Sequence, residues 1–356
     1  MARFELGLDT FGDVTVDADG RPLPQPVVIR QLVEQAVLAD ELGLDFFGVG
    51  EHHRDDFAVS APEVVLAAIA GRTERIRLGS AVTVLSSDDP VRVFQRFATL
   101  DAVSDGRAEV ILGRGSFTES FPLFGFDLGD YETLFEEKLD LFSLLLHEKD
   151  VTWSGTTRAA LDHQRVYPTT EHGLRAWVGV GGSPASVLRA ARYGLPLMLA
   201  IIGGDPLRFA PFADRYRAAL DQLERPPLPI GIHSPGHVAD TDEAARDEYW
   251  PHYRTMHARI GAERGWPPMQ RDQFDAQCGP QGALAVGSPE TVAAKIVRAA
   301  TGLGAARYDM KYSAGTLPHE LMVASIERYG TKVAPLVHEV LSSQDGVGGG
   351  SATFAP

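Results

Sequence analysis

The chain has 356 residues, 44% of them hydrophobic, which is enough apolar material for one large domain. Its formal net charge of −15 argues against a nucleic-acid partner or an anionic membrane surface, because both would repel the protein. A single cysteine, Cys278, excludes an internal disulfide framework and any metal site built from several cysteines. We therefore expect no metal. The short apolar runs also predict no signal peptide and no membrane span, so we expect a cytoplasmic protein.

Apolar β-rich runs alternate with segments of helical period along most of the chain. Residues 4–8, 45–49, 76–82, 108–112, 176–180, 196–201, 229–233 and 306–312 are the predicted strands. Residues 26–43, 61–72, 90–103, 129–147, 183–193, 205–223, 241–260, 288–303 and 318–336 are the predicted helices. This alternation is typical of a parallel sheet wrapped by helices. We predict a single α/β domain over residues 1–341, a (β/α)8 TIM barrel.

Three segments do not follow the alternation. Residues 151–167 contain two short β-rich pieces and predict an insertion after strand 4. Residues 261–286 are rich in proline and glycine and predict an irregular insertion after strand 7, of the kind that serves as a lid or an oligomer element. The tail from Ser342 has the composition of a linker, so we expect residues 342–356 to be disordered.

Candidate functional residues follow the strands, since the chemistry of such barrels lies at the C-terminal ends of their strands. His52 and His53 come after the second predicted strand, and Arg114 follows the fourth. Adjacent residues at a strand end point to opposite sides, so the two histidines are not expected to share a metal ion. One of them can exchange a proton at the barrel mouth or make a structural hydrogen bond. Arg114 can bind a phosphate or form a surface ion pair.

The segment after the fifth predicted strand contains an anion-binding pattern. Gly181 and Gly182 allow a ligand to approach the backbone, and Ser183 is placed to cap the next helix. The hydroxyls of Ser183 and Ser186 lie one turn apart, beside the exposed amides of the helix start. The alternative is an ordinary strand-to-helix junction with a good cap. The pattern lacks the third glycine of a dinucleotide fingerprint.

Several stretches together resemble the bacterial luciferase-like flavin monooxygenase family. They are EHH, LGSAVTVLSSDDPVRVFQRFATLDAVSDGR, GRG, GVGGSPASVLRAARYGLPLML, VGSPETVAAKIVRAATGLGA and YGTKVAPLV, and they cover nearly the whole chain. The resemblance implies a (β/α)8 barrel that binds reduced FMN at the strand C-termini and reacts it with O2. It also implies a homodimer, with residues 61–72 and 90–103 as the contact, and a separate flavin reductase.

By position, the resemblance assigns roles to individual residues. His52 falls on the family's catalytic histidine, and Arg114 falls on a phosphate-binding arginine. Ala81 and Val82 fall on a non-proline cis peptide beneath the flavin ring. The phosphate loop corresponds to Gly182, Ser183 and Ser186.

Two positions depart from the family pattern. Gly113 stands where luciferase has a reactive cysteine, which argues against light emission. Glu132 stands where luciferase has a second phosphate-binding arginine, which leaves less positive charge for the phosphate.

We predict a flavin-dependent monooxygenase that uses FMNH2 and O2 on a small organic substrate, with no nucleic-acid or membrane partner. One alternative is a hydride-transfer enzyme that uses the deazaflavin F420, although the EHH sequence favours FMN. The other is a flavin-binding protein without turnover, for which Gly113 and Glu132 are the only support.

Overall fold

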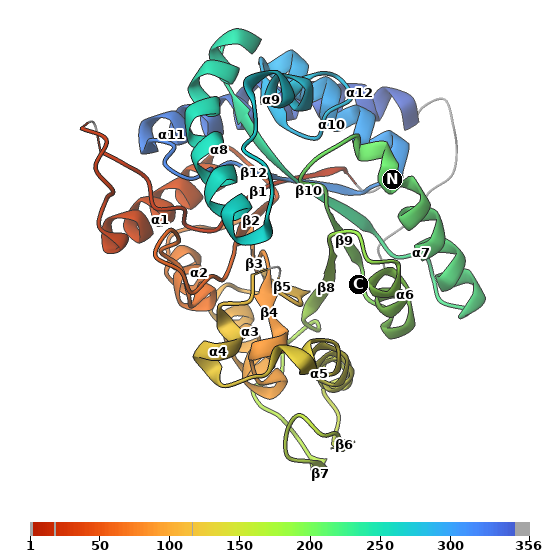
Figure 1. Ribbon diagram of the computed structural model, residues 1–356. Helices are drawn as coiled ribbons and strands as arrows, with labels where there is room; N and C mark the ends of the chain where they lie inside the picture. The colour runs from red at the N-terminus through yellow and green to blue at the C-terminus, as the bar shows by residue number, and fades with distance from the viewer. Residues whose placement is uncertain (1–2, 18, 116, 346–356) are drawn as a thin grey trace.

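The computed structural model describes residues 3–17, 19–115 and 117–345. Within these ranges, eight parallel strands close into a barrel with helices around it (Figure 1). They are β1 (Glu5–Thr10), β2 (Phe46–Val49), β3 (Arg77–Ser80), β5 (Ala108–Gly113), β8 (Arg175–Val180), β9 (Leu197–Ala200), β10 (Ile230–Val238) and β12 (Arg307–Lys311). The barrel closes because β12 pairs with both β1 and β10. The predicted (β/α)8 barrel is confirmed.

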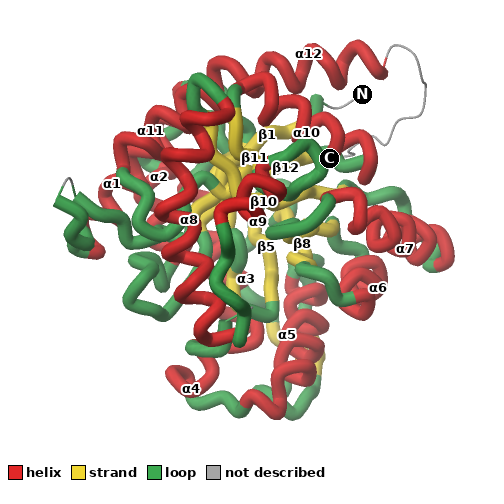
Figure 2. Tube along the Cα trace, turned by 45° about the horizontal axis from the view of Figure 1, so that its top comes forward, coloured by secondary structure: helices red, strands yellow, loops and turns green. Residues whose placement is uncertain are grey.

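Local sequence signals start and end the helices. Asp89 accepts hydrogen bonds from the amides of Val91 and Arg92 at the start of α3 (Pro90–Val103). Gly194 ends α6 (Pro184–Tyr193) in the left-handed conformation that favours glycine. Figure 2 shows the strands gathered at the centre with the helices outside. The other long helices are α1 (Gln25–Glu41), α2 (Pro62–Ala70), α5 (Tyr131–Leu145), α7 (Ala210–Gln222), α8 (Asp242–Arg264), α10 (Pro289–Leu303), α11 (His319–Arg328) and α12 (Ala334–Asp345).

The strands have two faces, because successive side chains point to opposite sides. Outward-pointing residues such as Leu8 and Ile232 pack beneath the helices in the large apolar core. The barrel interior holds a separate small cluster. Its members are Phe46, Ile111, Trp177 and Met198, with Val82 packed against them.

A buried ionic layer fills the end of the barrel where the strands begin. The guanidinium of Arg307 pairs with the carboxylates of Glu109 and Asp309, and all three side chains are almost completely buried. The same guanidinium lies 3.4 Å from the ring centroid of Phe46. Paired charges fill this end, which leaves the opposite end, where the strands finish, for a functional site.

The first predicted insertion forms a two-stranded antiparallel hairpin of β6 (Val151–Trp153) and β7 (Leu161–Gln164). It follows α5 and lies at the edge of the molecule, beyond the end of that helix (Figure 1). The hairpin precedes β8, so it belongs to the end of the barrel where the strands begin.

The second predicted insertion is present, but its irregular character was wrong. Residues 261–286 include the end of α8, the helix α9 (Arg271–Cys278) and most of β11 (Ala285–Gly287). A capping box between Gln270 and Gln273 starts α9. The strand β11 forms because β10 extends beyond the barrel and offers a free edge at Gly236–Val238. We call the segment 242–287 the α8–α9 insert.

The C-terminal boundary also differs from the prediction. The helix α12 continues to Asp345, so residues 342–345 are helical and do not belong to a disordered tail. The remaining residues of the predicted tail lie outside the described part of the chain. No helix among the described residues is long and apolar enough to cross a membrane.

Candidate active site at the mouth of the barrel

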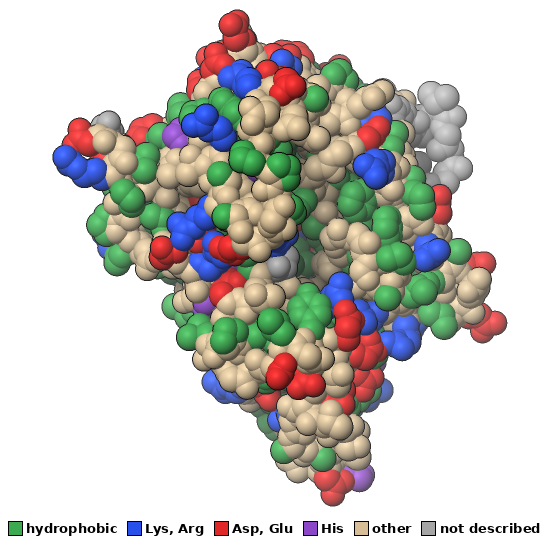
Figure 3. All heavy atoms as spheres, in the orientation of Figure 1, with side chains coloured by type: hydrophobic (Ala, Val, Ile, Leu, Met, Phe, Trp, Pro, Cys, Tyr) green, Lys and Arg blue, Asp and Glu red, His purple; other side chains and the backbone are tan. Residues whose placement is uncertain are grey.

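Inward-facing glycines shape the mouth, the end of the barrel where the strands finish. A Cβ on Gly50 would lie 2.4 Å from Cδ1 of Phe11, and a Cβ on Gly113 would lie 2.4 Å from Cγ2 of Val82. Real Cβ atoms do not approach so closely, so these glycines allow Phe11 and Val82 to reach over the interior. The face seen in Figure 1 is hollowed near its centre (Figure 3).

The Ala81–Val82 peptide bond is cis, as expected. Val82 packs against the apolar cluster inside the barrel. A Cβ on Gly179 would lie 3.2 Å from Cγ1 of Val82, so this side chain sits between Gly113 and Gly179. Val82 therefore forms an apolar surface at the mouth.

His52 lies in an aromatic pocket directly after β2. Its ring centroid is 4.4 Å from that of Phe57 and 5.0 Å from those of both Phe11 and Phe117. Its Nδ1 atom lies 3.3 Å from Oε1 of Glu119. The aromatic rings exclude water from most of the imidazole, whose side chain is 11% exposed.

His53 points away from His52, as the strand geometry predicts. Its Nε2 atom lies 3.0 Å from Oε1 of Glu51, whose other oxygen accepts a hydrogen bond from the amide of Val84. Both Glu51 and His53 line a different cavity, of about 270 Å³. Of the two histidines, His52 is thus the one that belongs to the mouth.

Glu119 was not predicted as a site residue. It lies 67 residues from His52 in the sequence, and no local motif links the two. Burial alone would raise the pKa of Glu119, but its hydrogen bond and charge interaction with His52, together with hydrogen bonds from backbone amides, outweigh burial and hold the pKa below its usual range. A charged carboxylate favours a proton on Nδ1 of His52, which leaves Nε2 as the nitrogen that can exchange one.

The glycine–serine turn after β8 starts α6 as predicted. Gly181 and Gly182 are exposed, and Gly182 has a φ of +128°, which other residues rarely adopt. The hydroxyl of Ser183 accepts a hydrogen bond from the amide of Ser186 at 3.4 Å. Ser186 is buried, and its hydroxyl accepts a hydrogen bond from Arg189 at 3.3 Å. Ser183 thus lies at the open end of the helix, with Ser186 beneath it.

Ion pairs neutralise the arginines beside this helix start. Arg114 pairs with Glu132, and Glu132 also lies 3.3 Å from Nη2 of Arg189. Glu136 pairs with both Arg189 and Arg192. Arg189, which was not predicted, places a second cation beside Glu132, the position at which the resemblance leads one to expect an arginine.

A buried acid–histidine pair lies at the mouth, and neither member was predicted. Nδ1 of His233 on β10 lies 2.7 Å from Oδ2 of Asp9 on β1. The other oxygen of Asp9, Oδ1, is buried without a hydrogen-bond partner among the described residues. The ring of Phe11 stacks on His233 at 6.1 Å and also contacts His52, so the two histidines flank one phenylalanine.

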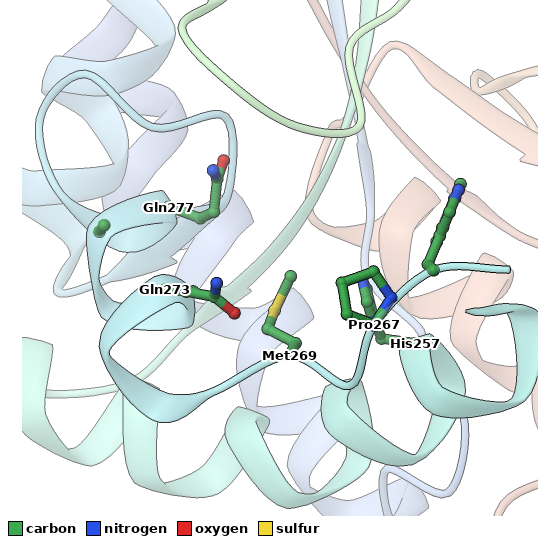
Figure 4. A pocket seen from close by; sticks show the side chains of 7 residues that line it. His257, Pro267, Met269, Gln273 and Gln277 are labelled. Atoms are coloured by element: carbon green, nitrogen blue, oxygen red, sulfur yellow. The ribbon is translucent and has the colours of Figure 1, made fainter. Parts of the chain in front are cut away.

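The α8–α9 insert contains a cavity of about 440 Å³ beside the mouth. Figure 4 shows Gln273 and Gln277 on one side of it, Pro267 and His257 on the other, and Met269 between them. The amide of Gly204 donates a hydrogen bond to Gln277 at 2.9 Å, which ties the insert to the loop after β9.

Arg264 connects this cavity with the pocket of His52. Its guanidinium lies 5.2 Å from the ring centroid of Trp266, which lines the cavity, and 4.8 Å from that of Phe117, which contacts His52. Among the described residues, no group of histidine, cysteine, aspartate and glutamate side chains is arranged to hold a metal ion.

Comparison with known proteins identifies the family of this barrel. The sequence profile described as "Luciferase-like monooxygenase" matches residues 10–307. The chain belongs to the luciferase-like monooxygenase family. The predicted resemblance is thereby confirmed.

Named monooxygenases are among the relatives within this family. The 4-hydroxyprotoasukamycin monooxygenase of Streptomyces nodosus subsp. asukaensis is 29% identical over 67% of this chain and 66% of its own length. Limonene 1,2-monooxygenase of Rhodococcus erythropolis is 30% identical over 61% of this chain and 57% of its own length. The chain thus spans less than two thirds of the length of these curated relatives.

Solved structures with this barrel include proteins with two different cofactors. Monooxygenase RslO1 from Streptomyces bottropensis has a TM-score of 0.79 at 23% identity, covering 93% of this chain and 99% of its own. The oxygenating constituent of 3,6-diketocamphane monooxygenase from Pseudomonas putida, in complex with FMN, has a TM-score of 0.73 at 18% identity, covering 94% and 98%. An F420-dependent secondary alcohol dehydrogenase has a TM-score of 0.73 at 15% identity, covering 94% and 99%. At these identities the likeness shows the fold alone.

Proposed function

We propose that this luciferase-like protein is a monooxygenase that uses reduced FMN and O2 on a small organic substrate. The observation that carries the proposal is the arrangement of the mouth, where His52, the apolar surface of Val82 and the open start of α6 follow neighbouring strands. The monooxygenase names of the relatives support the reaction type, and the FMN complex of a structural neighbour supports the cofactor.

The start of α6 fits the phosphate of FMN. Its backbone amides and the positive end of the helix dipole favour an anion, and Gly181 and Gly182 let one approach the chain. Ser183 would donate its hydroxyl proton, and Arg114 and Arg189 would provide positive charge from the side. Glu132 would compete with the phosphate for both arginines.

The remaining residues of the mouth fit the ring system of a flavin. Val82 offers an apolar surface on which a planar ring can rest, with glycines on both sides of it. When bound, reduced FMN supplies the electrons for the reaction with O2. His52 would hold and exchange the proton at Nε2, while Glu119 keeps its ring oriented through Nδ1.

A charge placed at Ser183 tests this assignment. Aspartate caps helices as well as serine does, so Ser183→Asp should fold normally but set a carboxylate against the phosphate. We expect the Kd for FMN, measured by fluorescence titration, to rise about tenfold or more, which corresponds to roughly 1.4 kcal/mol. The affinity for riboflavin, which lacks the phosphate, should not change. An unchanged FMN affinity would show that the phosphate binds elsewhere.

The same titration, together with a turnover assay, separates the alternative functions. Tighter binding of F420 than of FMN would favour a hydride-transfer enzyme on this barrel. FMN binding without consumption of a substrate in the presence of FMNH2 and O2 would favour a flavin-binding protein without turnover.

We also propose a homodimer through α2 and α3 and a separate flavin reductase, both on the basis of the resemblance. Light scattering at micromolar concentration that gives the monomer mass would count against the dimer.

A further inference from the structure

We infer that Asp9 and His233 form a second proton-exchanging pair of the active site, which acts on a carbonyl or hydroxyl oxygen of the substrate. The inference rests on the proposed function, because it requires the reaction to take place at this mouth. It is carried by the position of the pair inside the barrel, by its hydrogen bonding and by its contact with the pocket of His52.

The closure of the barrel brings the two side chains together. Asp9 is on β1 and His233 is on β10, and β12 lies between these two strands. In the strand register Asp9 lies opposite Lys311 of β12, and His233 lies opposite Asp309 of β12. The two side chains therefore meet across β12. A Cβ on Gly48, on the other side of β1, would lie 3.0 Å from Cβ of Asp9. Glycine at position 48 therefore allows Asp9 to pack closely against β2, near the end of the barrel where the strands finish.

The hydrogen bonding leaves one atom of each member without a partner. Oδ2 of Asp9 holds Nδ1 of His233, which fixes a proton on Nδ1 and leaves Nε2 for exchange. Nε2 has no hydrogen-bond partner among the described residues, and the His233 side chain is 12% exposed, close to the value for His52. Oδ1 of Asp9 is also unpaired within the described chain. A buried carboxylate oxygen without a donor is costly, so this atom suits a donor that arrives with a ligand, such as a hydroxyl group.

The charges that face His233 favour its protonated form. Burial alone would lower the pKa of His233, but Asp9 outweighs burial and raises the pKa above its ordinary value. From β12, Asp309 acts in the same direction and Lys311 opposes it. On the side of β9, the residue in register is Ala200, which carries no charge. The imidazole can therefore donate a proton near neutral pH and take it back.

The proposed step moves one proton from His233 to the substrate oxygen and requires no oxidation or reduction of either histidine or aspartate. When an oxygen nucleophile derived from O2 and FMNH2 attacks the carbonyl carbon of a substrate, its electron pair forms a new C–O bond and the π electron pair of the C=O bond moves to the carbonyl oxygen. That oxygen takes the proton from Nε2 of His233, and the electrons of the broken N–H bond stay on Nε2. Nδ1 keeps its proton and its hydrogen bond to Asp9. His52 lies on the other side of Phe11, so one histidine serves the oxygen chemistry and the other serves the substrate.

The variant His233→Asn separates catalysis from folding. The asparagine amide can still donate to Asp9 from nearly the position of Nδ1, but the titrating Nε2 atom is gone. His237→Gln is the matched control on the same strand, because its amide can keep the contact with Glu248, which Nε2 of His237 makes at 2.8 Å. We would supply FMNH2 and O2 with cyclohexanone or decanal as probes, and measure FMN affinity, kcat and the pH profile of kcat.

We expect His233→Asn to bind FMN within twofold of wild type and to lose about 100-fold or more in kcat, together with one ionisation of the pH profile. His237→Gln should match wild type. By NMR, Asp9→Asn should lower the pKa at which the Cε1–H resonance of His233 titrates. That resonance should also shift when cyclohexanone is added to the FMN-bound wild type.

The possible contrary results distinguish a failure of the proposed function from a failure of the inference about Asp9 and His233. Wild type that does not bind FMN would overturn the proposed function, and this inference with it. Wild type that turns over a probe while His233→Asn keeps the same rate and pH profile would overturn the inference alone. The same holds if His233→Asn weakens FMN binding as much as it lowers turnover. If wild type binds FMN but converts neither probe, an unmoved Cε1–H resonance on adding cyclohexanone would overturn the inference.

Discussion

Val82 occupies the space that a side chain on Gly113 would need, since a Cβ there would lie 2.4 Å from Cγ2 of Val82. A larger residue at position 113 therefore requires a smaller one at position 82. We expect Gly113→Ala to lower the free energy of unfolding by about 1 to 3 kcal/mol, because extra atoms in a packed interior force neighbours aside. Adding Val82→Ala should recover most of this loss. Urea unfolding of both single variants and the double variant measures the coupling, and full stability of Gly113→Ala would contradict it.

Glu132 should weaken phosphate binding, because it neutralises Arg114 and Arg189 beside the start of α6. Glu132 is largely exposed, so the effect is modest. We expect Glu132→Gln to tighten FMN binding about two- to fivefold, and the gain to shrink at high salt. Glu137→Gln is the control on the same helix, since that carboxylate binds the amide of Thr156 instead. Equal FMN affinity in wild type and Glu132→Gln would argue against this phosphate position.

His52→Ala should slow the reaction of bound FMNH2 with O2 and substrate while leaving FMN binding within twofold. The reason is that His52 lies in the aromatic pocket after β2, whereas the expected phosphate contacts lie at the start of α6. Loss of a general acid or base costs about 100- to 10,000-fold in rate. Stopped-flow oxidation of FMNH2 measures it. The control His53→Gln can keep the hydrogen bond to Glu51 and should retain full activity. If His53→Gln slows the reaction more than His52→Ala does, the catalytic role would belong to His53 instead.

Lys138 should make stability rise with pH. Burial lowers the pKa of Lys138 to about 8, while its pKa in the unfolded chain is about 10.4. Between these pH values the unfolded chain binds more protons than the folded one, so the free energy of unfolding rises with pH. The cost of burying the charged ammonium group is therefore complete below about pH 8 and decreases towards pH 10.4. We expect Lys138→Met to raise the free energy of unfolding by about 1 to 3 kcal/mol at pH 7 and by less at pH 10.

Urea unfolding between pH 6 and pH 10 measures this difference. Lys149→Met, at an exposed position beyond the end of α5, is the control and should not change the pH dependence. If the free energy of unfolding of Lys138→Met differs from that of wild type by the same amount at every pH, the buried charge is not the cause of the difference.

The order of strands and helices is determined by the sequence alone, because its signals are local. Apolar runs of period 2 or 3.6, the proline at the start of α3 and the glycine at the end of α6 act within a few residues of one another. For the same reason the strand-end position of His52 and the capping role of Ser183 could be predicted. The helix α9 was missed, although the capping box between Gln270 and Gln273 was a local signal for it.

Only the tertiary structure decides which side chains meet. Glu119 reaches His52 across 67 residues, and Asp9 reaches His233 across 224. The first contact depends on the pairing of β2, β3 and β5, and the second on the register with which β1, β10 and β12 close the barrel. No local pattern encodes these pairings. The edge that pairs with β11 likewise exists only because β10 extends beyond the barrel. Hydrogen bonds of this kind are set by the geometry of a closed sheet, in which residues far apart in sequence become neighbours.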